Sequence, residues 1–146
     1  MNTTVTDIVA YEMLAMYLAK TSGQSFHQDE KEKGLLENAV TSVHKILRNP
    51  GNADPVLELK IILHKGLSLY LLKLNRKLPG DPMLKKAGDL LQELFEREDW
   101  HLLCSQAVKE IEDLTPVQAR WRLSSILRNG LIAMGKQYAG VKDLSR

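Results

Sequence analysis

Apolar residues recur at steps of three and four along most of this chain, which is the spacing of one face of an α-helix. The repeat fills six stretches, and no stretch alternates apolar and polar residues over the length of a strand. The stretches are separated by short segments rich in Gly, Pro, Asn and Asp. The pattern predicts one all-α domain over residues 1–146, with about six helices packed as a compact helical bundle or a stack of three α-hairpins.

Capping residues and breaks set the expected bounds of these helices. Thr4-x-x-Asp7 and Ser25-x-x-Gln28 resemble capping boxes, Asp81-Pro82 is a cap followed by a proline, and Gly140 suits a C-terminal cap. The expected helices run over about 5–21, from the Ser25 box to about 49, over 55–78, from Pro82 to about 95, from Trp100 to about 114, and from Pro116 to about 140.

The stretch 54–78 is the longest apolar run, and we expect the other helices to pack around it. Asp54-Pro55 begins this helix with a cap and a proline, and cations crowd its last turn before Pro79. Its apolar arc is more than half the circumference wide, because Leu57, Ile61 and Leu72 lie beside the main stripe. We therefore predict that this central helix is covered on more than one side.

A polar line crosses the apolar arc of the same helix. Lys60, His64, Ser68 and Asn75 fall within about 80° of one another, because steps of four and seven residues return to one helix face. Three interpretations remain open for this line. The lysine can reach solvent while the other three side chains bond to backbone or buried water. Alternatively, the line marks a small-ligand groove or the edge of a partner interface.

The net charge of +2 conceals an uneven distribution. Residues 60–86 carry seven basic and one acidic side chain, residues 87–114 carry two and eight, and residues 115–146 carry six and one. Helices of opposite charge neutralise one another if they pack side by side. If they do not, a basic surface remains that suits nucleic acid or an acidic protein. The residues expected on it are Lys73, Arg76, Lys77, Lys85, Lys86, Arg120, Arg122 and Arg128.

Motifs for catalysis or metal binding are missing from the sequence. There is no phosphate-binding glycine loop, no dinucleotide fingerprint and no His-Glu-x-x-His. Glu98 and His101 have the spacing of a di-iron ligand pair, but such a site needs two pairs. His101 and Cys104 are spaced for zinc, yet no second cysteine exists. We expect a non-enzymatic protein without metal or cofactor, with His101 on the surface and Cys104 buried.

The last helix carries the strongest signal for an interaction. Its inward stripe is expected to comprise Leu123, Leu127, Leu131, Met134 and Tyr138. On roughly the opposite side lie Trp121, Ser125, Arg128 and Ile132, with Arg122 and Lys136 at the flank of this side. Trp and Arg are enriched at interface hot spots. These residues either pack under another part of the chain or form a protein-binding patch.

The leading hypothesis is a protein-protein interaction or self-association module that docks through the last helix, which makes a homo-oligomer one expected form. Nucleic-acid binding through the basic residues is the alternative, and an enzyme or small-ligand carrier with a groove near His64 is the third. The N-terminus lacks a basic region and its apolar run is interrupted by Glu12, so we expect no signal peptide, and without a run of ~18 uncharged apolar residues we expect no membrane span. The single cysteine fits a reducing compartment. The expected location is the cytoplasm.

Overall fold

The computed structural model describes residues 3–20, 34–49 and 51–144, with side chains over 8–20, 34–49 and 51–137. These residues form six α-helices and no strand, which confirms the all-α prediction. The helices are α1 (Thr3–Lys20), α2 (Leu35–Arg48), α3 (Pro55–Lys77), α4 (Pro82–Leu94), α5 (Glu98–Ile111) and α6 (Pro116–Leu144).

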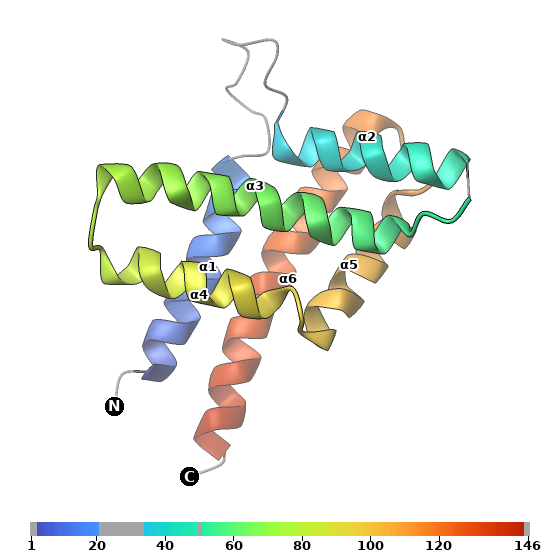
Figure 1. Cartoon of the computed structure of the whole chain (residues 1–146). Helices are drawn as coiled ribbons and strands as arrows, with labels where there is room; N and C mark the ends of the chain where they lie inside the picture. Colours follow the sequence, from blue (N-terminus) through green and yellow to red (C-terminus); the bar gives the residue numbers. More distant parts are fainter. Residues whose placement is uncertain (1–2, 21–33, 50, 145–146) are drawn as a thin grey trace.

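The helices are arranged in two layers. Figure 1 shows α2, α3 and α4 side by side in one layer, with α3 in the middle, while α1, α5 and α6 cross behind them. α3 packs against both neighbours in its own layer and against α5 and α1 in the other. The most extensive contact between two helices joins α1 and α6, which are far apart in the chain. The core therefore lies between the two layers.

Several helix bounds differ from those predicted, among them the end of α5, which lies at Ile111 rather than near Leu114. α2 begins at Leu35, and the expected start at the Ser25 box lies outside the described residues. α5 begins at Glu98 rather than Trp100, because Glu98 and Asp99 form a first turn where negative charge is favourable. α6 continues to Leu144, so Gly140 does not cap it. A glycine inside a helix costs only about 1 kcal/mol and does not end it by itself.

Side chains cap three of the helices. Asp54 Oδ1 accepts hydrogen bonds from the backbone N–H groups of Val56 (2.9 Å) and Leu57 (3.4 Å), and Asp81 Oδ1 accepts one from Met83 (2.8 Å). At the start of α6, Thr115 Oγ1 accepts from the Gln118 N–H, while Gln118 Oε1 accepts from the Thr115 N–H. These bonds satisfy N–H groups that a helix start leaves free, so the bounds of α3, α4 and α6 follow from local sequence.

The outer face of α3 is more open than predicted. Leu59, Leu63, Leu67 and Leu71, at steps of four, are buried against the second layer. α3 is thus covered on more than one side, as predicted, but Leu57, Ile61 and Leu72 at the edges of its apolar arc are 43%, 45% and 49% exposed. The physical reason is that α2 and α4 flank α3 while α1 and α5 lie beneath it. Among the described helices, none lies over its outer face.

Candidate functional site

Trp121 lies on the surface near the start of α6, with 64% of its area exposed. It lines a shallow hollow of about 430 Å³ together with Leu114, Gln118, Arg122 and Ser125. This exposure argues against the first of the two interpretations that the sequence left open, in which Trp121 packs under another part of the chain, while the protein-binding patch stays a prediction. Because a large aromatic ring gains most from leaving water, an exposed tryptophan beside a hollow is a natural contact point for another molecule.

Two neighbours of Trp121 extend this exposed area. Val117, one turn earlier on α6, is 61% exposed. The guanidinium carbon of Arg120 lies 5.7 Å from the centre of the Trp121 ring, within the range of a cation–π contact. We call the area formed by Leu114, Val117, Gln118, Trp121, Arg122 and Ser125 the Trp121 surface. This surface combines apolar area with one aromatic side chain, Trp121, whose ring is in cation–π contact with Arg120.

Arg122 is tied to α5 by an ion pair. Its Nη1 donates to Glu110 Oε1 over 2.9 Å, and Gln106 Nε2 donates to Glu110 Oε2 over 3.0 Å. The hydrogen bond from Gln106, followed by that from Arg122, lowers the pKa of the Glu110 carboxyl below its ordinary value. Both donors favour the ionised form. The polar edge of the Trp121 surface therefore connects α6 with α5.

The other two residues of the predicted patch lie outside the Trp121 surface. Arg128 is half-buried, and its Nε donates to the backbone oxygen of Ser124 over 3.4 Å. Ile132 is half-buried and packs against the core. The reason is that α6 packs on α1, α2 and α5 along its length, so the face that is open near Trp121 becomes covered further on. The structure thus brings together Trp121, Arg122 and Ser125 only.

The polar line of α3 divides into two pairs. Lys60 and His64 both pack on Phe95, which follows α4: Lys60 Nζ lies 4.8 Å from the ring centre, and the His64 ring meets it edge-on at 5.4 Å. His64 Nδ1 is buried and has no hydrogen-bond partner among the described residues. The face of the Phe95 ring, rather than a carboxylate, thus stabilises the positive charge of Lys60.

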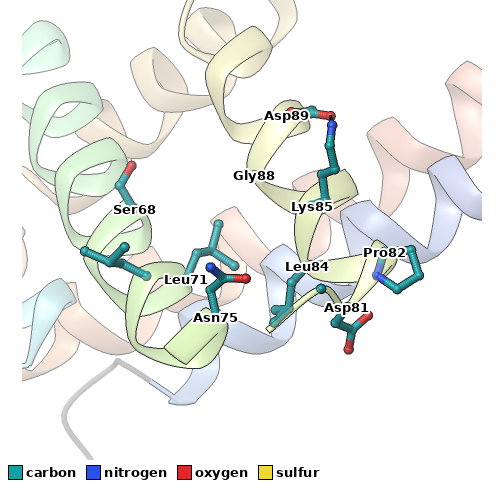
Figure 2. A pocket seen from close by; sticks show the side chains of 11 residues that line it. Ser68, Leu71, Asn75, Asp81, Pro82, Leu84, Lys85, Gly88 and Asp89 are labelled. Atoms are coloured by element: carbon teal, nitrogen blue, oxygen red, sulfur yellow. Dashed lines mark ion pairs between the residues drawn. The ribbon is translucent and has the colours of Figure 1, made fainter. Parts of the chain in front are cut away.

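Ser68 and Asn75 line a cleft between α3 and α4 with a volume of about 580 Å³. Figure 2 shows Leu71 and Leu84 reaching from the two helices into this cleft, with the Asn75 amide near its mouth. Ser68 Oγ is buried and, like His64 Nδ1, lacks a hydrogen-bond partner in the described part of the chain. Asn75 is exposed. His64 does not line the cleft, so the structure does not bring the four residues of the predicted groove together.

The predicted basic residues do not form one surface. Lys73, Arg76 and Lys77 are exposed at the end of α3, and Lys85 is exposed near the start of α4, so these four lie around the α3–α4 turn. Lys86 beside them is half-buried. Arg120 lies near the start of α6, at the other side of the molecule from that turn in Figure 1. The α3–α4 turn is thus the basic end of the front layer.

Among the described residues, few ion pairs neutralise the charges of one helix with those of another. Arg122 and Glu110 join α6 to α5, whereas Lys85 and Asp89 pair within α4 at 4.0 Å, and Arg97 pairs with Asp99 at the start of α5. None of these three ion pairs involves the cations of α3. The exposed charge at the end of α3 remains available to a binding partner.

Cys104 is fully buried, as predicted, and His101 is exposed. Burial raises the pKa of the Cys104 thiol to about 12, although nearby Lys60 acts in the opposite direction. A thiol with this pKa carries almost no thiolate at neutral pH and is a poor nucleophile. Among the described residues no group of three or more His, Cys, Asp and Glu side chains is arranged to hold a metal ion. Within the same part of the chain, no helix has the length and apolar character needed to cross a bilayer.

Two polar contacts between distant parts of the chain were not predicted from the sequence. His44 is buried on α2, and its Nε2 lies 2.8 Å from the backbone oxygen of Ile111, so the ring donates to a buried carbonyl at the C-terminal end of α5. Arg97 donates to the hydroxyl of Tyr11 on α1 and also pairs with Asp99. A histidine within an otherwise apolar stripe is a weak signal for the first contact. No sequence signal identifies the second, because its partners are separated by 86 positions.

No protein-family model, curated protein or solved structure matches this chain.

Proposed function

We propose that this chain is a non-enzymatic protein that binds another protein, or a second copy of itself, through the Trp121 surface. The single observation that carries the proposal is the 64% exposure of Trp121 beside a hollow of about 430 Å³. Trp, Tyr and Arg are enriched among the residues that carry most of the binding energy of protein interfaces, and two of these types, Trp121 and Arg122, lie together on this surface.

The geometry supports protein rather than small-molecule recognition at this place. The hollow is shallow and lies on the outer side of a helix, and the exposed side chain of Val117 lies one turn before Trp121 on that helix. Small-molecule sites instead enclose most of the ligand. Arg122 is held at the edge by Glu110, so it can take part in a polar rim without a large loss of side-chain entropy. We place this interaction module in the cytoplasm, because its single cysteine, Cys104, is a buried free thiol, as is usual in a reducing compartment.

Self-association is tested by light scattering over a concentration series of the wild type and of Trp121→Ala. Met16→Ala is the matched control, because Met16 is 47% exposed on α1 and does not line the hollow. We expect a mass that rises with concentration in the wild type and the control and stays that of a monomer in Trp121→Ala. An oligomer that is unchanged in folded Trp121→Ala contradicts self-association through this surface.

A different protein partner is tested with a photo-crosslinking amino acid in place of Val117, which leaves Trp121 intact. The same amino acid in place of Met16 is the control. We expect covalent adducts from position 117 in cells of the source, and their loss when Trp121→Ala is added. Adducts of equal yield at both positions, or none at either, contradict the proposal once light scattering has excluded a self-associated form.

A further inference from the structure

The outer face of α3 carries a stripe of exposed apolar and basic side chains. Ile61, Leu69 and Leu72 are 45%, 53% and 49% exposed, and Lys65 and Arg76 lie between and beyond them. The five positions follow at steps of four, four, three and four, which returns each to the same side of a helix. We call Ile61, Lys65, Leu69, Leu72 and Arg76 the α3 outer stripe. Its apolar part extends over about 16 Å at the rise of an α-helix.

The cleft between α3 and α4 opens beside one end of this stripe. Leu72 belongs to the stripe and also lines the cleft, whose volume of about 580 Å³ has room for side chains of a partner. Leu71 and Leu84 give it apolar walls, and Figure 2 shows Lys85 at its edge, paired with Asp89. The stripe and the cleft thus form one continuous surface with an apolar centre.

The charge around this surface is mostly positive at its α3–α4 end. The exposed charged side chains in the last four turns of α3 are Lys65, Lys73, Arg76 and Lys77. Within the described part of the chain, no carboxylate forms an ion pair with any of these four. Asp81 is used as the cap of α4, and Asp89 pairs with Lys85. The unneutralised charge beside exposed leucines therefore complements a partner that is both apolar and acidic.

We propose that the α3 outer stripe and the adjoining cleft bind an amphipathic acidic helix of a protein partner. Leucine-like side chains of that helix contact Ile61, Leu69 and Leu72, and one of them enters the cleft. Its flanking carboxylates pair with Lys65 and Arg76. The concave cleft favours an inserted helix over a flat lipid surface, and the exposed aliphatic side chains offer no aromatic ring on which nucleic-acid bases stack. This site is separate from the Trp121 surface and does not depend on it.

The test uses a fluorescent synthetic helix of about 18 residues, with leucines at steps of three and four and glutamates on both flanks. A peptide of the same composition in scrambled order, and one with lysine for glutamate, are the peptide controls. Anionic lipid vesicles and a single-stranded oligonucleotide are tested in parallel. We expect saturable binding of the periodic acidic helix, at least about tenfold tighter than either control peptide.

Two variants locate the binding on the protein. The double substitution Lys65→Glu with Arg76→Glu should weaken binding at least about tenfold, because like charges then face each other. Its matched control is Lys109→Glu with Lys136→Glu, which reverses two exposed lysines on α5 and α6. For the apolar part, Leu72→Ala should weaken binding severalfold, whereas Leu102→Ala, at a site 59% exposed on α5, should not.

Amide chemical-shift changes in the wild-type protein give a readout that requires no variant. They should occur along the α3 outer stripe and the first turns of α4, and not around Trp121. The proposal is overturned by equal binding of the periodic and scrambled peptides, by no binding of either, or by shift changes elsewhere. Binding of vesicles or oligonucleotide in preference to the acidic helix also overturns it and assigns this surface to lipid or nucleic acid.

Discussion

Gly135 of α6 lies so close to Tyr11 of α1 that a Cβ atom at Gly135 would stand 2.8 Å from the Cβ of Tyr11. Tyr11 is 1% exposed and cannot move outward without losing its packing. The close approach of the two helices therefore depends on the missing side chain. Gly88 on α4 is also helical, but a Cβ atom there would meet no atom within 4 Å.

The two glycines predict opposite results for one substitution. Gly135→Ala should lower the free energy of unfolding by about 1–3 kcal/mol, because the new methyl group forces α1 and α6 apart. Gly88→Ala should raise it by about 0.5–1 kcal/mol, since alanine is the better helix former and the space is open. Urea unfolding followed by circular dichroism measures both. Equal effects of the two substitutions would show that the contact with Tyr11 does not limit the approach of the helices.

Ser68 provides a second prediction. Its hydroxyl is buried without a hydrogen-bond partner among the described residues, and such a group costs about 1–3 kcal/mol in desolvation. Ser68→Ala should therefore raise the free energy of unfolding by about 1 kcal/mol. Ser125→Ala, at an exposed position on α6, should change it by less than about 0.5 kcal/mol. A loss of stability in Ser68→Ala would reveal a hydrogen bond from this hydroxyl in solution.

The buried thiol of Cys104 predicts slow alkylation of the folded protein. With a pKa of about 12, roughly one thiol in ten thousand is ionised at pH 8. Iodoacetamide at this pH should modify the guanidinium-unfolded chain, whose thiol has an ordinary pKa near 8.5, and leave the native protein largely unmodified. Mass spectrometry follows the reaction. Rapid modification of the native protein would show that α5 opens readily.

The same raised pKa has a consequence for stability. Above about pH 8.5 the unfolded thiol loses its proton while the folded thiol keeps it, so the free energy of unfolding falls as the pH rises toward 12. Cys104→Ala removes this contribution and should flatten the decline measured between pH 8 and 10. Identical slopes in the two proteins would contradict the assignment to Cys104.

Glu110 makes the free energy of unfolding depend on pH in the opposite sense, so that it falls as the pH is lowered in the acid range. Its pKa is lowered by the hydrogen bonds from Gln106 and Arg122, so its contribution to stability is present above about pH 4.3 and is lost as the pH falls through the folded pKa. Gln106→Ala and Arg122→Ala should each raise the pKa of Glu110, measured by NMR titration of its side-chain carboxyl carbon. Arg128→Ala is the control and should leave this pKa unchanged, because Arg128 bonds to the Ser124 backbone instead.

Much of the fold follows from local sequence. Asp54 and Asp81 cap the helices at the predicted places, and the predicted stripe Leu123–Leu127–Leu131–Met134 of α6 is buried. Both depend on neighbours within a turn or two, which the spacing of residues makes visible. Tyr138, predicted in the same stripe, lies beyond the residues whose side chains are described.

The arrangement of the helices, by contrast, depends on distant pairs. The exposure of Leu72 follows from the absence of a described helix over α3, and its apolar character alone predicted a buried position. Ile132 shows the opposite case: it was predicted on the same exposed side as Trp121 but packs against the core. Its position on a helical wheel does not reveal that other helices cover α6 further along. The cleft beside Ser68 likewise requires the position of α4 relative to α3. The periodicity of one helix indicates its main buried face, but it does not reveal which neighbouring helix covers that face or where along the helix a second face is covered.

The pairing of α1 with α6 also determines the order in which this protein completes its fold. During synthesis α1 leaves the ribosome before its principal partner α6, which follows more than a hundred positions later. Until then its buried face, with Tyr11, Leu14 and Leu18, packs mainly on α4 and less extensively on α3. The α3–α4 hairpin, whose contacts are local, forms early at low entropic cost. α6, which follows the other described helices in the chain, therefore closes the core over α1.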